Sequence, residues 1–279
     1  GSSSLNANTE GYRNVVMGQG ALQYNTTGDE NIAIGYSALL YQILPNYNIG
    51  IGTDAGRYNV EGTNNVSMGY YAGRGYYQAT NNDGNTAIGT KALETNRTGD
   101  NNTAVGYTAG NALLSGDNNT IIGFGADAAS NSTSNSVTLG NSSISTLRCN
   151  TQSITSLSDA RDKTNIEDLP IGLGFINTLR PRKFEWNTRD GAKVGITEGG
   201  FIAQELQQAE EGNEWLGLVY EENPEKLEAS YGNLLPVLVK AVQELSEELE
   251  TQKKEIAKLR MENKKMSMAR PASAGLGDE

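Results

Sequence analysis

The chain has 279 residues, a net charge of −11, no histidine and one cysteine, Cys149; this excludes an internal disulfide, a Ser-His-Asp triad and histidine-based zinc sites. The 37% hydrophobic content and 33 glycines are too lean for one large core and favour short strands and tight turns. Neither a cluster of Lys and Arg nor an apolar run of about 18 residues occurs, so we expect no nucleic-acid partner and no membrane insertion.

Residues 1–150 carry a repeat, Asn-x-x-(Ile/Met/Val)-Gly, with a spacing of 17 residues and one step of 20. The motif glycines are Gly18, Gly35, Gly52, Gly69, Gly89, Gly106, Gly123 and Gly140, and Ser136 replaces Asn in the last copy. A small residue follows three positions after each glycine: Ala21, Ala38, Ala55, Ala72, Ala92, Ala109, Ala126 and Ser143. A strict period with one apolar, one glycine and one small position predicts stacked, near-identical rungs.

The rungs are predicted to form a parallel β-roll or β-helix shaft. Segments such as Ile32-Ala33-Ile34 and Thr120-Ile121-Ile122 have strand character, and the repeat is too short for a pair of helices. Stacked Asn side chains would hydrogen-bond from rung to rung, and Gly and Ala would let neighbouring backbones approach closely. Because each rung offers only two or three apolar side chains, we expect several copies of the chain to close the core.

The repeats, for example Asn85-Thr86-Ala87-Ile88-Gly89, resemble the rungs of trimeric autotransporter adhesin heads and, more closely, those of phage tail-fibre shafts. This resemblance covers about half the chain and implies a trimeric shaft of about eight rungs. A rigid spacer is the simplest role for it. Alternatively its outer face contacts a host cell-surface receptor, a glycan or a protein. Tyr70, Tyr71, Tyr76 and Tyr77 flank the irregular step, and such aromatics suit sugar stacking or packing against a neighbouring chain.

Residues 151–157 are rich in Ser and Thr and are predicted to be an extended linker. It leads to Ser158, which lies five residues before Lys163. A serine hydroxyl needs a base, and without histidine a lysine amine is the available one, provided that burial or nearby cations lower the pKa of that amine. The spacing puts both residues on one side of a tight turn or a first helical turn. The plainer alternative is that Ser158 and Asp159 only cap a turn.

Four further segments follow in order: Ser158 to Ile166, Leu179 to Trp186, Gly200 to Leu206 and Tyr231 to Pro236. Together they resemble the C-terminal intramolecular chaperone, or auto-protease, domain of phage tail spikes and fibres, over roughly residues 157–262. A related domain occurs in a family of membrane-bound eukaryotic transcription factors.

The resemblance implies that Ser158 attacks the Leu157 carbonyl, that Lys163 accepts the proton, and that water hydrolyses the resulting ester once per chain. It also implies supporting roles for Asp159, Arg161 and Asn165, although a solvated ion pair is the simpler interpretation of the first two.

Residues 158–232 are predicted to form a small α+β domain, so the chain is mainly β and then α+β. Alternation of Phe184 and Trp186 predicts a strand with one buried face, and Gly199-Gly200 predicts a turn before a packed strand or helix. No cofactor signature is present, and none is expected. Three glutamates, Glu210, Glu211 and Glu214, are interpreted as a solvated face rather than as metal ligands.

Residues 233–268 show an apolar period of seven. One set of positions is Leu235, Val242, Leu249, Ile256 and Asn263, and the other is Leu238, Leu245, Gln252, Leu259 and Met266. This heptad pattern predicts a coiled coil, for which the shaft and the family resemblance favour three strands. The alternative is one amphipathic helix folded back on its own domain. Residues 269–279 are predicted to be a disordered tail.

The sequence therefore predicts the distal part of a viral tail fibre or spike, assembled as a homotrimer in the host cytoplasm and carried on the virion. Near-identical rungs can pair out of step, and a C-terminal trimer would set one register before cleavage at Leu157–Ser158 releases it. An uncleaved adhesin fibre, with the C-terminal domain as a permanent foot, is the alternative. A glycan hydrolase in the shaft is disfavoured because no carboxylate pair stands outside the repeat.

Overall fold

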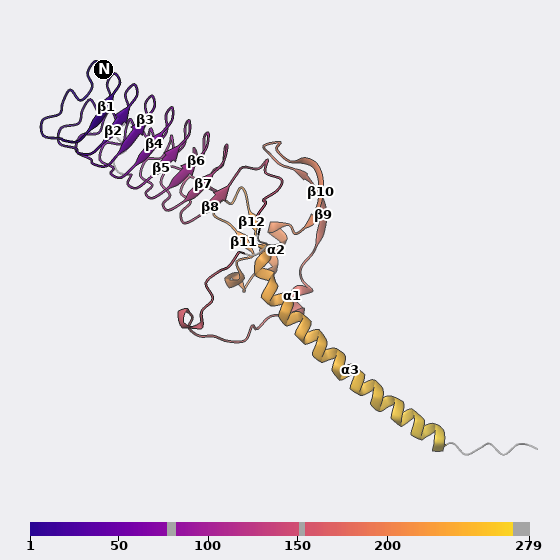
Figure 1. The fold of residues 1–279 in the computed structure, drawn as a ribbon. Coiled ribbons are helices and arrows are strands. Elements are labelled where there is room, and N and C mark those ends of the chain that lie inside the picture. The colour runs from indigo at the N-terminus through magenta and orange to yellow at the C-terminus, as the bar shows by residue number, and fades with distance from the viewer. Residues whose placement is uncertain (77–81, 151–153, 270–279) are drawn as a thin grey trace, which may run out of the picture. The chain divides into compact units, whose positions relative to one another are not determined.

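The computed structural model describes residues 1–76, 82–150 and 154–269, and the chain divides into two compact units (Figure 1). The first unit comprises Gly1–Gln152, Trp186–Ile196 and Glu222–Lys226, and the second comprises the remaining segments. No helix within the described residues has the length and apolar character needed to cross a membrane.

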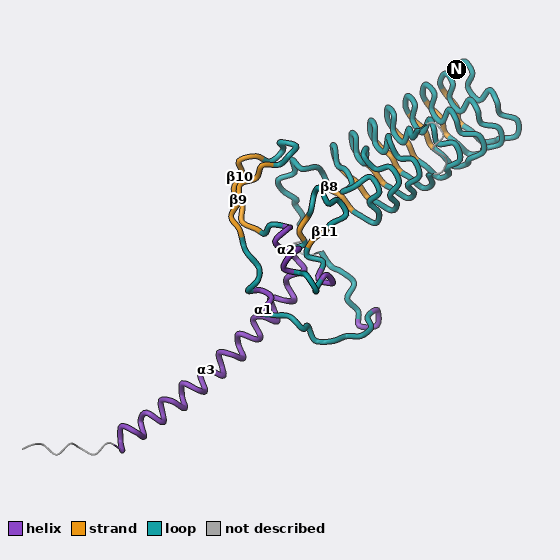
Figure 2. Tube along the Cα trace, turned by 180° about the vertical axis from the view of Figure 1, so that it is seen from behind, coloured by secondary structure: helices purple, strands orange, loops and turns teal. Residues whose placement is uncertain are grey.

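The described residues between 15 and 139 form a parallel β-solenoid in which eight strands pair in chain order (Figure 2). The strands are β1 (Val15–Met17), β2 (Ile32–Ile34), β3 (Ile49–Ile51), β4 (Val66–Met68), β5 (Thr86–Ile88), β6 (Thr103–Val105), β7 (Thr120–Ile122) and β8 (Val137–Leu139). Equivalent positions of the repeat face each other throughout, so the predicted stack of rungs is confirmed.

Asparagine ladders hold the rungs together in the interior. The backbone N–H of Asn48 donates to Oδ1 of Asn31 at 2.9 Å, and the N–H of Asn65 donates to Oδ1 of Asn48 at 2.9 Å. The same bond recurs from the first motif to the last, where the N–H and hydroxyl of Ser136 donate to Asn119 at 3.1 and 2.8 Å. The predicted ladder is confirmed, and it satisfies polar groups that the solenoid buries.

The motif glycines permit a close approach of neighbouring backbones, as predicted. Gly35 has a φ of +135°, and a Cβ built on it would lie 2.5 Å from the carbonyl oxygen of Gly52 in the next rung. A side chain at this position would therefore meet rigid backbone and a strained φ together.

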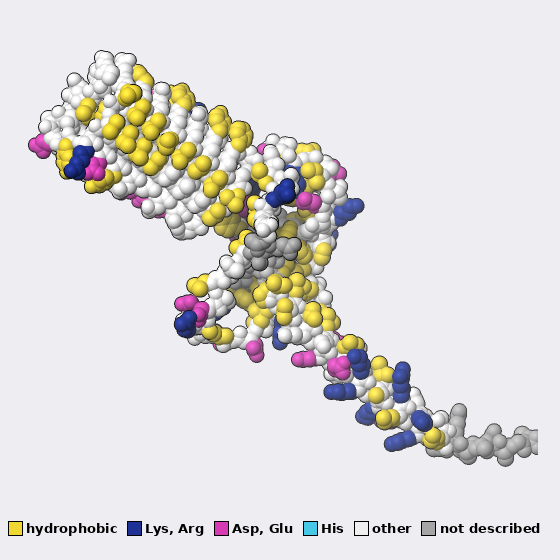
Figure 3. Space-filling view, viewed as in Figure 1, with side chains coloured by type: hydrophobic (Ala, Val, Ile, Leu, Met, Phe, Trp, Pro, Cys, Tyr) yellow, Lys and Arg dark blue, Asp and Glu magenta, His cyan; other side chains and the backbone are white. Residues whose placement is uncertain are grey.

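The strands direct their middle residue inward and their two flanking residues outward. The middle residues Ala33, Ala87 and Ala104 are fully or almost fully buried. The flanking residues are mostly Val, Ile, Met and Leu, and they are half-buried or exposed. Figure 3 shows rows of hydrophobic side chains along the solenoid. Most of the larger apolar strand side chains therefore lie on the outer face, with Ile121 of β7 as an exception.

The interior apolar packing is interrupted near the middle of the solenoid. One buried cluster contains Leu22 and Leu39, and another contains Leu93, Leu113 and Ile121. Between these clusters the interior positions hold Gly56, Ser67 and Gly73. The rungs therefore share one backbone path but differ in the side chains that fill their interior.

The described residues from 154 to 269 form short helices, two small sheets and one long helix. These elements are α1 (Leu173–Ile176), β9 (Arg182–Asn187), β10 (Val194–Gly200), α2 (Ala203–Ala209), β11 (Val219–Tyr220), β12 (Glu228–Ala229) and α3 (Leu235–Ala269). Three 3-10 turns add to them, namely η1 (Ala160–Asp162), η2 (Glu214–Leu216) and η3 (Tyr231–Leu234). The core of the second unit consists of Phe175, Leu206, Leu216, Leu218, Leu234 and Val237.

The strand predicted around Phe184 and Trp186 is confirmed as β9, whose burial alternates along its length. The turn predicted at Gly199-Gly200 is wrong, because both glycines end strand β10 and helix α2 follows shortly after.

The solvated face predicted for three glutamates is wrong for Glu210. Its side chain is 5% exposed, and Oε2 accepts a hydrogen bond of 2.8 Å from the backbone N–H of Leu218. A buried N–H needs an acceptor, and the carboxylate supplies it. Glu211 and Glu214 are exposed, as predicted.

Helix α3 is confirmed where the heptad pattern predicted a helix. Its apolar seam positions are exposed in the single chain, including Leu238, Leu245 and Leu249 at 45, 48 and 52%. Residues 270–279, which include most of the predicted disordered tail, lie outside the described residues.

Candidate functional site: the junction around Ser158

The segment before Ser158 is open to solvent and has no regular structure. Residues 154–158 are all exposed, with Ile154 at 97% and Leu157 at 82%. An accessible segment without regular structure leaves the Leu157–Ser158 peptide bond open to an attacking group. The preceding residues 151–153 of the predicted linker lie outside the described residues.

The short turn η1 brings the chain back toward Ser158. Asp159 caps this turn, since its Oδ1 accepts a hydrogen bond of 2.9 Å from the N–H of Arg161. The N–H groups of Asp162 and Lys163 donate to the carbonyls of Asp159 and Ala160 and complete it. Lys163 then returns to an extended conformation, with φ −127° and ψ 146°.

The two predicted reactive side chains are in contact. Nζ of Lys163 lies 2.6 Å from Oγ of Ser158 and 3.4 Å from the carbonyl oxygen of the same residue. This distance is within the range for proton transfer between a nucleophile and its base. Both side chains are exposed in the single chain. The spacing of five residues thus does bring serine and lysine together, through one 3-10 turn.

Comparison with protein families adds a second observation at the same residue. Residues 158–214 match the model of Peptidase_S74, described as the chaperone of endosialidase. The resemblance to a tail-spike chaperone domain is confirmed for this segment. The match begins at Ser158 and covers about a fifth of the chain. No curated protein and no solved structure matches the chain.

Within residues 158–214, here called the chaperone segment after the family model that they match, Asp159 and Arg161 form a solvent-exposed ion pair. Nε and Nη2 of Arg161 lie 3.0 and 2.6 Å from the two carboxylate oxygens, and the arginine side chain is 88% exposed. The hydrogen bond from the guanidinium and that from the backbone N–H lower the pKa of Asp159 below its usual value. This pair and the cap on η1 keep the turn that places Lys163 near Ser158.

The other predicted supporting residue, Asn165, follows the turn. It adopts a left-handed conformation with φ +52°, which asparagine tolerates better than most residues. Among the described residues, its side chain makes no hydrogen bond to Ser158 or Lys163. The left-handed conformation of Asn165 therefore turns the chain after η1, without a side-chain hydrogen bond to the reactive pair.

One contact that the sequence did not predict ties the long helix to the chaperone segment. Oε2 of Glu244 on α3 accepts a hydrogen bond of 2.7 Å from the N–H of Leu173, the first residue of α1. The carboxylate lies so close that a Cβ on Gly172 would come within 2.5 Å of it. In the sequence, Gly172 before α1 could have indicated this contact, because a glycine has no side chain to cap the helix and another residue can do so.

Three of the four predicted receptor-contact tyrosines, Tyr70, Tyr71 and Tyr76, are described in the first unit, within the 20-residue step from Gly69 to Gly89. The rings of Tyr70 and Tyr71 stack with centroids 3.9 Å apart, and the guanidinium of Arg74 lies 4.4 Å from the centroid of Tyr71. Tyr76 is 48% exposed, with the guanidinium of Arg97 4.6 Å from its ring centroid. Tyr77 lies outside the described residues.

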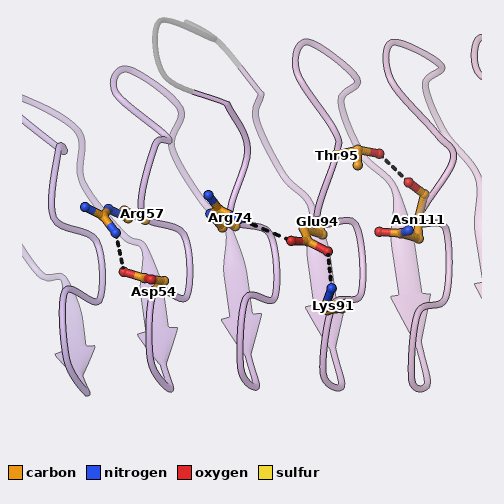
Figure 4. A network of polar contacts seen from close by, with 7 residues as sticks. All are labelled: Asp54, Arg57, Arg74, Lys91, Glu94, Thr95 and Asn111. Atoms are coloured by element: carbon orange, nitrogen blue, oxygen red, sulfur yellow. Dashed lines mark hydrogen bonds and ion pairs between the residues drawn. The ribbon is translucent and has the colours of Figure 1, made fainter.

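Arg74, whose guanidinium lies over the Tyr71 ring, belongs to a group of charged side chains on neighbouring rungs (Figure 4). Arg57 pairs with Asp54 at 2.9 Å, Arg74 pairs with Glu94 at 3.3 Å, and Lys91 pairs with Glu94 at 3.4 Å. The Arg74–Glu94 pair joins two neighbouring rungs, whereas the other two pairs each lie within one rung. The acidic side chains of Asp54 and Glu94 are largely buried in these pairs.

Proposed function

We propose that the chain is the distal part of a viral tail fibre or spike. Its β-solenoid shaft is assembled as a homotrimer by a C-terminal intramolecular chaperone, which then releases itself by cleaving the Leu157–Ser158 bond. The observation that carries this proposal is the 2.6 Å contact between Ser158 and Lys163 at the first residue of the chaperone-family match.

The proposed reaction uses only groups of the chain and one water. Lys163 takes the proton of the Ser158 hydroxyl while Oγ attacks the Leu157 carbonyl carbon, and a C–O bond forms. The C–N bond then breaks, and the lysine returns the proton to the departing α-amino nitrogen of Ser158. Water hydrolyses the ester, which leaves a carboxylate on Leu157 and restores the serine hydroxyl. Each copy acts once.

The exposure of the reactive pair favours a reaction that follows assembly. A lysine amine accepts a proton only in its neutral form, and burial favours that form. Ser158 and Lys163 are both exposed in a single copy. In our proposal the neighbouring copies cover the pair, so that cleavage is coupled to completion of the trimer.

Two exposed apolar surfaces support assembly from identical copies. The first is the outer face of the solenoid strands, where Met17, Ile88 and Leu139 are 67, 38 and 52% exposed. An exposed apolar face that repeats at every rung matches a partner with the same repeat, and another copy of the chain provides one.

The second surface is the heptad seam of α3. Its exposed members include Leu238, Leu245, Leu249, Ile256 and Leu259, between 45 and 52% exposed. Three such helices would bury these side chains in a coiled coil. Joining the chains at one end raises the effective concentration of their shafts, and loss of the chaperone afterwards makes separation slow.

A denaturing gel of freshly expressed full-length chain tests the cleavage. We expect two pieces, residues 1–157 and 158–279, and a new N-terminus at Ser158 by sequencing. Ser158→Ala and Lys163→Met should each leave one uncut band. Ser156→Ala, two residues upstream of the reactive serine, is the matched control and should be cut as the natural chain is. A single uncut band from the unmodified chain in its trimeric state rules the reaction out.

An uncleaved adhesin fibre is the second candidate. It is favoured by the cap that Asp159 provides for η1, since a capped turn next to a serine needs no catalytic role. In that case the C-terminal domain stays as a permanent trimerisation foot. In either case, contact with a host glycan or protein through Tyr70, Tyr71 and Tyr76 is a proposal that rests on the exposure of Tyr70 and Tyr76, at 45 and 48%, and on the stacking of Tyr71 against Tyr70.

A further inference from the structure

The outer face of the solenoid changes composition along its length. Each strand contributes two outward side chains, from its first and its third residue. The third residues are apolar in every strand: Met17, Ile34, Ile51, Met68, Ile88, Val105, Ile122 and Leu139. The first residues change from Val15, Ile32, Ile49 and Val66 to Thr86, Thr103 and Thr120, and then to Val137.

At both borders of this threonine segment the strands keep the register of the rest of the solenoid. Val66 pairs with Thr86 and Thr120 pairs with Val137 in the same parallel register as all other rungs. The 20-residue step also falls between β4 and β5, and its extra residues leave the strand pairing undisturbed. The first outward column is therefore continuous in space, with an apolar part, a threonine part and a final valine.

We infer that this threonine segment is a register mark that the copies of the chain read on one another when their shafts pack together. The inference rests on the proposed trimer. It assigns the outer strand face of residues 15–139 to further copies of this chain, and it assigns the rung register of those copies to Thr86, Thr103 and Thr120.

The physical reason lies in the difference between threonine and valine. Copies related by a rotation axis place the same residue at the same height. In our inference the first outward column faces that axis, so that each threonine meets the threonines of its partners. Their hydroxyls can then hydrogen-bond across the interface. A shift by one rung would set a Thr86 hydroxyl beside Val66 of a partner and Val137 beside Thr120. A buried hydroxyl without a partner is unfavourable, although the two side chains have nearly the same shape.

The mark also explains why so repetitive a shaft need not depend on its chaperone alone. The other outward column is apolar at every rung and would tolerate a shift. The first column penalises the shift at both borders of the threonine segment and at both interfaces of a shifted copy in a closed ring. In this account α3 brings the chains together, and the shaft itself rejects the neighbouring registers.

Disulfide mapping tests the mark in the full-length chain. Two differently tagged forms of the chain are co-expressed, both with Cys149→Ser. One form carries Val105→Cys. The other carries Val105→Cys in a first experiment and Ile122→Cys in a second. A 105–105 disulfide reports shafts in register, and a 105–122 disulfide reports a shift of one rung. With the natural face, we expect the 105–105 product to dominate.

The triple variant Thr86→Val, Thr103→Val and Thr120→Val removes the mark, and we expect the 105–122 share to rise several-fold. The matched control replaces Thr27, Thr53 and Thr98, which lie outside the strands, by valine and should leave the share unchanged. An unchanged share in a triple variant that light scattering shows to be trimeric overturns the register mark and leaves the proposed assembly intact. A monomeric natural chain overturns the assembly and the mark together.

Discussion

The solenoid and the second unit reach stability in opposite ways. In the solenoid one backbone pattern repeats eight times, and buried asparagines bond each rung to the next. The second unit has short strands and helices, the long helix α3, and a core of six buried side chains among its described residues. A stack of repeats is stabilised by the sum of similar neighbour contacts, whereas a small core is gained or lost as a whole. A destabilising substitution should therefore affect only nearby rungs of the solenoid, whereas in the second unit it should affect the whole unit.

The largest effect is expected from breaking an asparagine ladder. Asn102 is fully buried, its Oδ1 accepts from the N–H and the side-chain amide of Asn119 at 3.0 and 2.9 Å, and it donates to the Gly116 carbonyl at 2.8 Å. Asn102→Ala leaves these buried groups without partners and should cost about 3 kcal/mol. Hydrogen exchange should rise in β5 to β7 and stay low in β1 to β3.

Asn131→Ala is the matched control, since this asparagine is exposed and its side chain supports no rung-to-rung ladder within the described residues. Uniformly faster exchange over all eight strands of the Asn102 variant would contradict the neighbour-by-neighbour picture. It would mean that the solenoid unfolds as one cooperative body.

The backbone of the solenoid was predictable because the repeat itself states which residues are equivalent. The spacing of the motif set the strands, and asparagine at one fixed position predicted the ladder that runs through Asn48 and Asn65. The filling of the interior was not predictable in the same way. Leu39 fills space that a Cβ on Gly50 would enter, and the sequence alone does not show that these residues from different rungs meet.

The second unit has no repeat, and the sequence predicted it less well. Glu210, next to Glu211 in the sequence, was expected in solvent. In the structure its carboxylate is buried and accepts a hydrogen bond from the N–H of Leu218, eight residues later. The contact of Ser158 with Lys163 was predicted because it depends only on five residues of local chain. The groups that would cover Ser158 and Lys163 lie far away in the sequence or on other copies of the chain. The local spacing of residues carries no information about such groups.

A smaller effect is expected from separating α3 from α1. Glu244→Ala removes the acceptor for the N–H of Leu173 and should destabilise the second unit by about 1–2 kcal/mol. Because this unit has one core, the loss should appear as an earlier unfolding transition for the whole unit. Circular dichroism with denaturant would measure it, since α3 dominates the helical signal.

Glu247→Ala, three residues further along α3, is the control and should leave this transition in place because its side chain is exposed. If the Glu244 variant exposes only residues near α1 to hydrogen exchange, the second unit is less cooperative than its single core indicates. The contrast with the solenoid would then be weaker.

The smallest effect is a pH dependence confined to the second unit. Glu205 of α2 accepts a hydrogen bond of 2.9 Å from Nε of Arg182 and lies near Arg180. The hydrogen bond with Arg182 is the main favourable cause that lowers the pKa of Glu205 below its usual value. A carboxylate whose pKa is lowered by folding stabilises the fold above its unfolded pKa and loses that effect as the pH falls through its folded pKa.

We therefore expect the midpoint of the second unit's transition to fall on acidification below the ordinary glutamate range, and Glu205→Gln to flatten this slope. Glu211→Gln, on an exposed residue near α2, is the control and should keep the natural slope. The asparagine ladders carry no titrating group, so exchange from the interior of the solenoid should stay level over the same range once intrinsic rates are corrected for pH. Equal acid sensitivity in β2 to β7 would show that the two regions share one transition, and the distinction between them would be lost.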